Sequence, residues 1–340
     1  MVDPTDLSGL VSLGWDDDWS NKLASSPFEG SPARVVRHDG VKVMVSDGES
    51  VYHVTFPRSI QLAVGDWVQV KNETVSGILE RTSQLERDSA ESGPQIIAAN
   101  VDLVLVVFGA DRPLRKSKVL RFVAFAWDLG ARPVVVVSKI DLHEDSSRLV
   151  SEIESWVGDV DVIETSIEDG VGVDKLFSLL SGRTGTLIGE SGAGKSSLVN
   201  ALMEDEVAWI GDVRERDAKG RHTTTHRELH LLPGGGMIID NPGIRSLGLS
   251  SEGEGVEELF SDIEELAVLC RFRDCAHRTE PGCAVLAAIE AGELARDRWH
   301  TYCRFIDEQT ESSARAQSKQ RLKNARKEAS AAQRARDRDM

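Results

Sequence analysis

The middle of the chain alternates two hydrophobic patterns from about residue 96 to about residue 248. Short, uninterrupted apolar runs are separated by longer stretches in which apolar residues recur at helical spacing. Such runs are typical of strands buried on both faces, and their alternation with helices indicates a mostly parallel, doubly wound α/β sheet. The predicted strands cover residues 103–108, 134–137, 160–164, 184–188, 228–232 and 237–239, and the predicted helices cover residues 117–129, 148–156 and 195–203.

Different patterns flank this region. Residues 31–90 hold short β-rich runs broken by turn dipeptides such as Asp39-Gly40 and Asp47-Gly48, which predicts a small OB-type barrel. Residues 1–30 read as a partly ordered acidic leader, and residues 88–95 read as a linker. After the α/β domain (residues 91–248), we expect a mostly helical domain over 249–310, with helices at 256–269, 285–291 and 294–308. A helical tail is expected over 311–340.

Composition and charge narrow the class of protein. The chain has 340 residues and a formal net charge of −16, which disfavours nonspecific binding to polyanions. Residues 311–340 differ from this acidic average, because they contain nine basic and four acidic residues and are therefore net positive. The longest apolar runs are far shorter than the ~20 residues that cross a membrane, and the amino-terminal residues do not resemble a signal peptide. We therefore expect a cytoplasmic protein.

A glycine-rich segment follows the predicted strand at 184–188 and leads into the helix at 195–203. Its residues match the pattern G-x-x-x-x-G-K-[ST], in which backbone N–H groups surround a polyphosphate at a helix N-terminus. The alternative is a glycine-rich surface turn, which the strand and helix on either side disfavour. Lys195 would reach the β- and γ-phosphates, and Ser196 would bind Mg²⁺. The predicted nucleotide contacts are Gly189, Glu190, Ser191, Gly192, Ala193, Gly194, Lys195, Ser196 and Ser197.

A second phosphate element follows the predicted strand at 237–239. Asp240 begins the sequence Asp-Asn-Pro-Gly, where a carboxylate would hold Mg²⁺ through water. The backbone N–H of Gly243 would then face a γ-phosphate. This sequence alone is typical of a common turn. Its occurrence together with the glycine-rich segment upstream favours a role in binding Mg²⁺ and phosphate.

The base-reading residues are predicted after two other strands. Ser138, Lys139, Ile140 and Asp141 follow the run at 134–137 in the pattern x-K-x-D. The Asp141 carboxylate would accept hydrogen bonds from the two donors on the guanine edge, and the Lys139 stem would lie against the ring. Adenine offers no matching pair of donors, and an unpaired carboxylate would cost ~1–3 kcal/mol. Ser166 and Ile167 follow the next strand, where a backbone N–H would meet guanine O6.

These elements occur in an unusual order along the chain. The base-reading loops precede the glycine-rich segment, and Asp240 comes last. Either order is physically allowed, because loops at the carboxyl ends of parallel strands converge at one edge of the sheet. The order predicts a circularly permuted P-loop GTPase domain that binds GTP or GDP.

A cysteine and histidine cluster predicts a metal site. Cys270, Cys275, His277 and Cys283 have the spacing C-x4-C-x-H-x5-C, and their three thiols and one imidazole suit a closed, structural Zn²⁺ site. The alternative is buried thiols beside a surface histidine. Cys303 is expected to be a small buried hydrophobic residue and not a ligand.

The chain resembles the ribosome-small-subunit-dependent GTPase A (RsgA) family of bacteria over nearly its whole length. The stretches that carry the resemblance are Pro32-Ala33-Arg34-Val35, residues 78–87, Ala98-Ala99-Asn100-Val101-Asp102, residues 220–225, Leu232-Pro233-Gly234-Gly235-Gly236, residues 270–277 and Glu280-Pro281-Gly282-Cys283. The resemblance implies an OB barrel, a permuted GTPase domain and a C-terminal zinc domain. It also implies GTP hydrolysis stimulated by the small ribosomal subunit during late maturation. The departures are Ser138 where Asn or Thr is usual, Asn241 where Thr or Ser is commoner, and Ile167 in place of a small residue.

Catalysis needs a group that the sequence does not supply at the usual place. Ile244 stands where Ras-like GTPases have a water-orienting glutamine, so intrinsic hydrolysis is expected to be slow. His222 is the candidate catalytic residue, with a solvated loop histidine or an RNA contact as the alternative. Arg221 or Arg245 could instead neutralise charge in the transition state. In the same segment, Thr224 is preferred over Thr223 as the third Mg²⁺ ligand beside Ser196 and Asp240.

The expected partner is the small ribosomal subunit with its rRNA. Basic and aromatic residues are interleaved along the predicted barrel, as in OB barrels that bind nucleic acid, and the alternative is a solvated surface over core aromatic residues. The basic tail could lie along phosphates. We expect a monomer. Two other function classes stay open, an ATP-driven nucleic-acid enzyme and a scaffold that a bound nucleotide locks in shape. The barrel residues are Arg34, Arg37, Lys42, Tyr52, His53, Phe56, Arg58, Trp67, Lys71, Arg81 and Arg87.

Overall fold

The structure is a computed structural model of the chain and describes residues 7–40, 42–89, 93–203, 227–240, 255–307 and 310. The chain divides into two compact units, Met1–Gly248 and Leu249–Met340, and each is described by itself. Within the described residues, no helix combines the length and the apolar character that a membrane span needs.

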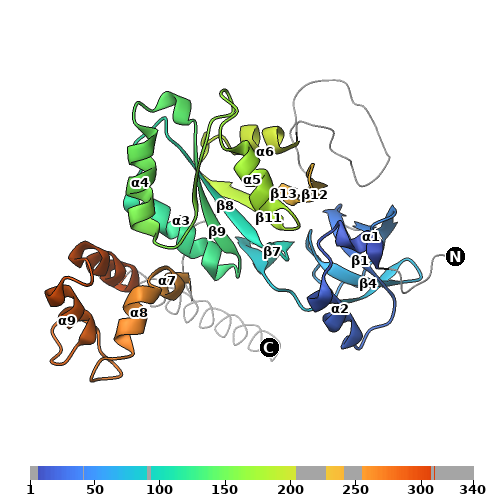
Figure 1. Cartoon of the computed structure of the whole chain (residues 1–340). Coiled ribbons are helices and arrows are strands. Elements are labelled where there is room, and N and C mark those ends of the chain that lie inside the picture. Colours follow the sequence, from blue (N-terminus) through green and yellow to red (C-terminus); the bar gives the residue numbers. More distant parts are fainter. Residues whose placement is uncertain are drawn as a thin grey trace, which may run out of the picture. The chain divides into compact units, whose positions relative to one another are not determined.

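The core of the first unit is a parallel sheet with one antiparallel strand at its side (Figure 1). All six predicted strands are present, with ends shifted by at most two residues. Their spatial order places the strand before the glycine-rich segment, β11, between β8 and β13. The strands, in order across the sheet, are β10 (Val162–Thr165), β9 (Arg132–Ser138), β8 (Leu103–Gly109), β11 (Thr184–Gly189), β13 (Met237–Asp240) and the antiparallel β12 (Glu228–Leu231).

Helices cover both faces of this sheet. On one face, Leu105 and Val107 of β8 pack with Leu176 of α5 and Leu198 of α6. On the other face, Phe108 contacts Phe122 of α3 edge to face, with ring centroids 5.5 Å apart. The predicted helices are present, whereas the short α5 was not predicted. The elements are α3 (Lys116–Asp128), the 3-10 turn η1 (Ile140–Leu142), α4 (Ser146–Val157), α5 (Val173–Leu180) and α6 (Lys195–Met203).

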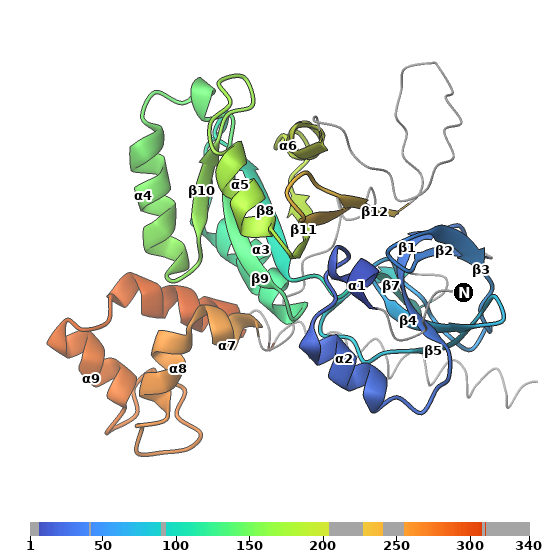
Figure 2. The same cartoon turned by 45° about the vertical axis from the view of Figure 1, so that its right-hand side comes forward.

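A five-stranded antiparallel sheet forms the amino-terminal part of the unit (Figure 2). Its strands lie in the order β3-β2-β1-β4-β5, and a bridge between Thr55 and Thr74 links the two ends of this order. The inner residues are almost all valine, alanine and leucine, as alternating half-buried strands require. A single register pair, Arg37 with Glu228, joins β1 to β12. The strands are β1 (Ser31–His38), β2 (Val43–Ser46), β3 (Val51–Val54), β4 (Trp67–Lys71) and β5 (Thr74–Ile78).

The leader contains two short helices in residues 7–30, which the structure describes. Residues 7–30 contain α1 (Ser8–Val11) and α2 (Asp17–Ala24). Trp15 packs edge to face on Trp67 of β4, with ring centroids 4.7 Å apart, and Trp19 packs beside it. Asp16 accepts a hydrogen bond from the Trp19 N–H at 3.0 Å and caps α2. The acidic run therefore begins a helix that contains the buried Trp19, and the buried Trp15 lies just before it.

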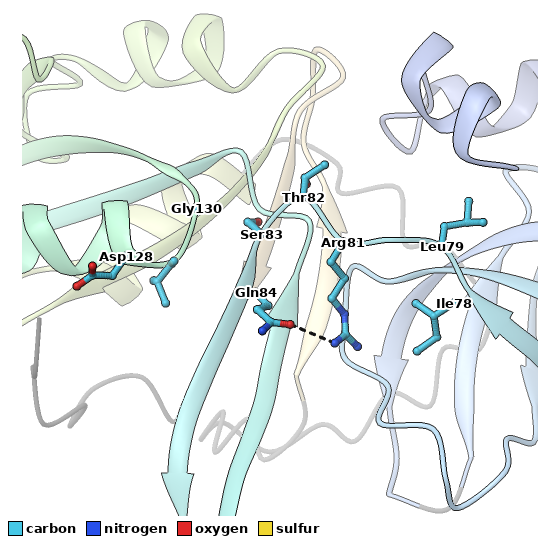
Figure 3. Close-up of a pocket in the computed structure, with 9 residues that line it drawn as sticks. Ile78, Leu79, Arg81, Thr82, Ser83, Gln84, Asp128 and Gly130 are labelled. Atoms are coloured by element: carbon cyan, nitrogen blue, oxygen red, sulfur yellow. Dashed lines mark hydrogen bonds between the residues drawn. The ribbon is translucent and has the colours of Figure 1, made fainter. Parts of the chain in front are cut away.

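The predicted linker at residues 88–95 is instead part of a β-hairpin. Strands β6 (Gln84–Ser89) and β7 (Gly93–Ala99) pair in antiparallel register. The start of this hairpin borders an open cavity of 570 Å³ between the end of β5 and the C-terminal end of α3 (Figure 3). The polar composition of residues 88–95 hid the strands, because this stretch lacks the apolar positions by which strands are recognised.

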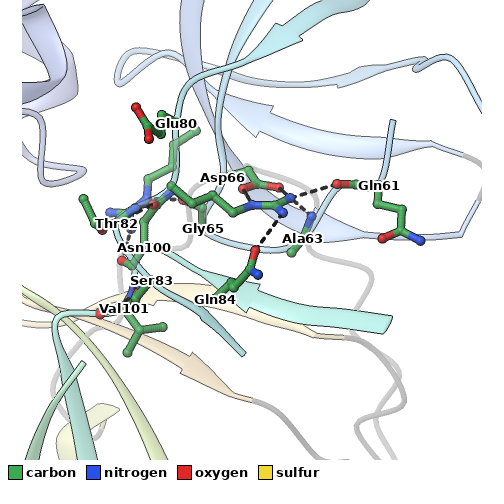
Figure 4. A network of polar contacts seen from close by, with 12 residues as sticks. Gln61, Ala63, Gly65, Asp66, Glu80, Thr82, Ser83, Gln84, Asn100 and Val101 are labelled. Atoms are coloured by element: carbon green, nitrogen blue, oxygen red, sulfur yellow. Dashed lines mark hydrogen bonds and ion pairs between the residues drawn. The ribbon is translucent and has the colours of Figure 1, made fainter. Parts of the chain in front are cut away.

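A buried polar network connects the barrel to the hairpin (Figure 4). Asp66 is fully buried, and its carboxylate receives Arg81 Nε at 2.7 Å and Arg81 Nη2 at 2.8 Å. The Asn100 side chain donates to Gly65 O at 3.0 Å and accepts from the Thr82 N–H at 3.0 Å. Each buried polar group is thus paired, which avoids the cost of unsatisfied groups.

The second unit is helical. Its helices are α7 (Gly255–Leu259), α8 (Ser261–Ala267), α9 (Ala284–Ala291) and the helical residues 296–307. The predicted single helix at 256–269 is interrupted at Phe260, whose ring is buried against Tyr302 and Phe305. The predicted tail at 311–340 lies outside the described residues.

Candidate nucleotide site and metal centre

The glycine-rich segment has the backbone that only glycine adopts easily. Gly189, Gly192 and Gly194 have φ values of +140°, +78° and +85°. A Cβ at Gly189 would lie 2.2 Å from the carbonyl oxygen of Val107 on β8. The segment therefore turns tightly against the neighbouring strand before α6 begins at Lys195.

A cavity of 250 Å³ lies at the start of α6. Its lining residues include both phosphate-site and base-site candidates, namely Lys139, Ser191, Gly192, Gly194, Lys195, Ser196 and Ser197. The Lys195 ammonium donates to Gly189 O at 2.8 Å and to Glu190 O, which keeps its charge inside the loop. A cavity bordered by backbone amides, an ammonium and a helix N-terminus suits a polyphosphate.

The predicted base-reading loop touches the glycine-rich segment directly. Ser138 Oγ donates to Ala193 O at 2.6 Å, and Lys139 Nζ donates to Gly192 O at 2.8 Å. Lys139 adopts a left-handed backbone with φ of +59°, and the exposed Asp141 follows it in η1. Loops more than fifty residues apart in sequence thus meet at one place.

Ser166 and Ile167 lie at the end of the next strand of the row. Ser166 is fully buried, and its backbone pairs with Val171 in both directions, at 3.1 and 2.9 Å. Its hydroxyl accepts from the Asp169 N–H at 3.1 Å, so the loop is held in a tight turn. Ile167 is 36 % exposed, beyond β10 and on the same edge of the sheet as the Ser138 loop.

Asp240 ends β13, the strand that pairs with β11 on the side away from β8. It therefore lies at the same strand edge as the glycine-rich segment. Gly243, Thr224 and His222 lie outside the described residues, as do Thr223, Arg221, Arg245, Asn241 and Ile244, and their roles stay predictions.

Two residues that sequence reasoning missed complete this edge. Asp111 and Arg112 follow β8, between the ends of β9 and β11. Asp111 Oδ2 accepts from Lys139 Nζ at 2.9 Å, and Arg112 lies against the carbonyl groups of Ser191 and Gly192. Hydrogen bonds from Arg112 and then Lys139 lower the pKa of the Asp111 carboxyl to about 2. Their position could have identified Asp111 and Arg112 as site residues, because polar residues at the carboxyl end of a central parallel strand lie near the ligand site of such sheets.

The second unit brings its four predicted metal ligands together. The ligand atoms of Cys270, Cys275, His277 and Cys283 all lie within 4.8 Å of one another. The Cys270 and Cys283 sulfurs are 3.8 Å apart, and each is 3.5 Å from His277 Nδ1. A tetrahedral ion with Zn–S distances of ~2.3 Å would separate two sulfurs by about 3.8 Å. The donor set and its spacing therefore fit Zn²⁺.

Backbone contacts hold these ligands in place. The Ala284 N–H donates to Cys270 Sγ at 3.3 Å, and Cys283 Sγ caps α9 by accepting from the Leu286 N–H. The Glu280 carboxylate accepts from the N–H groups of Ala276, Arg278 and Thr279, and these bonds lower the pKa of Glu280 to about 2. Cys303 is buried apart from the cluster, as expected.

Of the barrel residues offered as RNA contacts, Trp67 and Arg34 are buried, whereas Lys71 is exposed beside Glu29. Trp67 is fully buried, and Arg34 is 2 % exposed. Arg81 is paired with the buried Asp66, and Lys71 with Glu29. The core alternative holds for Trp67 and Arg34, because apolar and hydrogen-bonding neighbours enclose them. Lys42 and Arg58 are exposed.

Comparison with known proteins identifies the family. A family profile described as RsgA GTPase matches residues 78–250. The chain is 41 % identical over 338 residues to the small ribosomal subunit biogenesis GTPase RsgA of Streptomyces coelicolor, covering 93 % of this chain and 92 % of that protein. It is 43 % identical over 315 residues to the protein of the same name from Streptomyces avermitilis, covering 88 % and 85 %.

Solved structures agree with this result. The crystal structure of YjeQ from Thermotoga maritima is similar with a TM-score of 0.62 and 29 % identity, covering 82 % of this chain and 98 % of that one. YloQ, described as a circularly permuted GTPase, is similar with a TM-score of 0.62 and 28 % identity, covering 83 % and 95 %. With a glycine-rich segment that follows the Ser138–Asp141 loop in sequence and touches it in space, as a circular permutation requires, the chain belongs to the RsgA GTPase family.

Proposed function

We propose that this chain is a GTPase that binds the small ribosomal subunit, acts in its late maturation and hydrolyses GTP to GDP and phosphate. The observation that carries the proposal is the direct contact of Ser138 and Lys139 with the glycine-rich segment. The cavity beside this contact is lined by Lys139 and by residues of the glycine-rich segment and the start of α6, which supports binding of one nucleotide across both loops. The names of the curated relatives supply the ribosomal context.

Each site residue then has a distinct task. Lys195 and the loop amides bind the phosphates, Asp141 accepts the guanine donors, and the backbone at Ser166 and Ile167 faces guanine O6. Ser196, Thr224 and Asp240 would hold Mg²⁺, which neutralises phosphate charge when bound. The Gly243 N–H would contact the γ-phosphate, and His222 would orient the attacking water.

We further propose that the cluster of three cysteines and His277 holds one structural Zn²⁺. All four positions of a tetrahedral ion are then filled by protein, so this site has no place for a substrate. The proposed domains are a leader at 1–30, an OB-type barrel at 31–90, the GTPase domain at 91–248, the zinc domain at 249–310 and a basic tail at 311–340. The bridge between Thr55 and Thr74 supports the barrel assignment.

The proposed partners are the small subunit and its rRNA. The basic tail and the exposed Lys42 and Arg58 carry charges that suit phosphate contacts, whereas the acidic remainder disfavours general coating of RNA. We propose a cytoplasmic monomer, because each copy carries one complete set of nucleotide and metal residues.

Multiple-turnover phosphate release with purified subunits tests the function. We expect slow GTP hydrolysis by the protein alone, strong stimulation by small subunits and little by large subunits. Excess ATP should not compete, because Asp141 selects guanine. Equal stimulation by both subunits, or competition by ATP, would contradict the proposal. A bound nucleotide without turnover would favour the scaffold alternative.

The role of His222 has its own test. His222→Ala is expected to lower the subunit-stimulated kcat at least tenfold, since a general base contributes on the order of 10²-fold or more. The affinity for GTP should change little, because the phosphate loop and Asp141 are untouched. Unchanged turnover would remove His222 from the mechanism and direct attention to Arg221 or Arg245.

A further inference from the structure

Three side chains hold the outer side of the phosphate loop. Arg112 lies against the carbonyl oxygens of Ser191 and Gly192, with its Nη atoms at 3.4 and 3.3 Å. Lys139 Nζ also donates to the Gly192 carbonyl, at 2.8 Å. Ser138 Oγ donates to the next carbonyl, that of Ala193. Three successive carbonyl groups of the loop therefore point toward the ends of β8 and β9.

Because a peptide unit is planar, contacts that fix the direction of its carbonyl group also fix the direction of its N–H group. In a trans peptide the carbonyl of one residue and the N–H of the next point in opposite directions. A donor on the Ser191 carbonyl therefore directs the Gly192 N–H away from Arg112, and a donor on the Ala193 carbonyl does the same for Gly194. The peptide between them closes a turn, because the Ala193 N–H donates to Glu190 O at 3.3 Å.

The two residues whose N–H groups are directed away from these donors, Gly192 and Gly194, belong to the wall of the cavity. Ser191, Gly192 and Gly194 line it, and Arg112 is absent from the described residues that do so. A Cβ at Gly192 would lie 3.2 Å from Arg112 Nη2, so the guanidinium is packed closely on the outer face of the loop. Arg112 thus acts on the loop from behind.

Asp111 fixes Arg112 and Lys139 relative to each other. Its two carboxylate oxygens contact the Arg112 guanidinium, each at 3.2 Å, and Oδ2 also accepts from Lys139 Nζ at 2.9 Å. Asp111 is held against β8, since a Cβ at Gly109 would lie 2.4 Å from Asp111 Oδ1. The loop after β8 therefore connects the phosphate loop and the base-reading loop through one carboxylate.

We infer that Arg112, held by Asp111, is a positioning residue that orients the amides of the phosphate loop toward the phosphates of a guanine nucleotide. The inference rests on the proposed function, because it needs a nucleotide in this cavity. Arg112 belongs to neither nucleotide motif and does not line the cavity. Its effect is therefore on affinity for the phosphate part of the ligand and not on the choice of base.

Binding of labelled GDP to the full chain, with guanosine and GTP as competitors, tests this inference. Arg112→Gln is expected to raise the Kd for GDP and GTP about fivefold, since a partly exposed charged donor contributes modestly. The Kd for guanosine, which has no phosphate, should not change. Arg112→Lys should recover part of the affinity, because an ammonium can reach one carbonyl but cannot bridge two.

Arg115→Gln is the matched control. Arg115 lies in the same segment before α3, is exposed, and among the described residues its side chain has no hydrogen bond to the loop. It removes the same charge, so its GDP affinity should stay within twofold of the wild type. Three results would overturn the inference alone. These are an equal loss of GDP affinity in Arg115→Gln, an unchanged GDP affinity in Arg112→Gln, and a loss of guanosine affinity in Arg112→Gln equal to its loss of GDP affinity. A wild-type chain that binds no guanine nucleotide would overturn the proposed function and the inference together.

Discussion

Ser138 shows how one small side chain can connect two loops. Its hydroxyl lies 2.6 Å from Ala193 O and 3.1 Å from Phe108 O, and the residue is 5 % exposed. Ser138 stands where the family resemblance implies Asn or Thr. Its hydroxyl ties the loop at Ser138–Asp141 to the glycine-rich segment, and no such contact can be read from the residue type alone.

Asp141→Asn is expected to change which base the site prefers. In the proposed function the carboxylate would accept from two guanine donors, and an amide replaces one acceptor with a donor. GTP affinity should fall at least about 30-fold, whereas xanthosine triphosphate should gain, because xanthine carries a carbonyl where guanine carries an amino group. Competition against labelled GDP measures both. Glu144→Gln, which removes an exposed acid from the same loop, should alter neither. Parallel losses for both nucleotides would contradict the base-reading role.

Arg34 is a buried side chain that forms hydrogen bonds to the leader, to the barrel and to the parallel sheet. It donates to the carbonyls of Leu13, Gly65 and Asn100 and to Thr184 Oγ1 on β11, and its guanidinium stacks on Trp67. Burial lowers the pKa of Arg34 to about 10, so the group stays charged at neutral pH. The leader, the barrel and the sheet thus share one cation.

Arg34→Met should therefore destabilise the first unit strongly. Methionine fills similar space but leaves several buried acceptors without a donor, at a cost of about 3 kcal/mol. The urea midpoint, followed by tryptophan fluorescence, should fall accordingly. Arg58→Met, at an exposed position of the same barrel, should leave the midpoint nearly unchanged. Similar midpoints for the two variants would show that the junction contacts contribute little.

At the scale of helices and strands, the elements that could be predicted were those with a clear hydrophobic pattern in the sequence. The strands of the parallel sheet are uninterrupted apolar runs, so they were placed within two residues. Helix α5 is only eight residues long, and the part of the hairpin β6–β7 nearest its turn is polar, so neither stood out in the sequence. The leader helices were hidden because their apolar residues are buried against Trp67, Leu79 and Leu231, which lie far away in the sequence. Long-range packing, and not local propensity, makes these elements.

The contact between β1 and β12 predicts a pH dependence. His38 ends β1 and His230 lies on β12, and burial lowers the pKa of both, with Arg227 also lowering that of His38. The unfolded chain then binds more protons than the folded one around and below pH 6.5, so stability is lost as pH falls through this range. Each histidine contributes a slope of at most about 1.4 kcal/mol per pH unit.

The double variant His38→Gln/His230→Gln isolates this effect from other titrating groups. Between pH 7.5 and 5, its thermal midpoint should fall less steeply than that of the wild type, because glutamine does not titrate. The difference between the two midpoints should therefore change over this range and become constant once the histidines are protonated in both the folded and the unfolded state. Parallel curves would mean that the histidines titrate alike in the folded and unfolded states.

At the scale of the molecule, the shuffled order of motifs was the most informative part of the sequence. Parallel strands place their carboxyl ends on one edge, so Ser138, Ser166, Gly189 and Asp240 could be assigned to a single site before any coordinates. Asp111 lies on the same edge but belongs to no motif. Its role became visible only through the contact with Lys139, because motif spacing carries no information on side-chain contacts between strands.

The division into two units predicts that metal and nucleotide binding can be separated. Every described nucleotide-site residue lies in Met1–Gly248, and all four metal ligands lie in Leu249–Met340. A strong chelator should remove one zinc ion per chain and reduce helical circular dichroism, because metal binding energy is folding energy in small metal domains. Affinity for labelled GDP should stay within twofold.

Cys275→Ser should reproduce the effect of the chelator, since the loss of one thiolate opens a four-ligand site. Cys303→Ser is the matched control: it changes a buried thiol outside the cluster and should retain full zinc. Metal analysis of both variants measures the outcome. Full zinc in Cys275→Ser, or loss of zinc in Cys303→Ser, would refute the ligand assignment. A loss of GDP binding along with the metal would instead show that the second unit supports the nucleotide site.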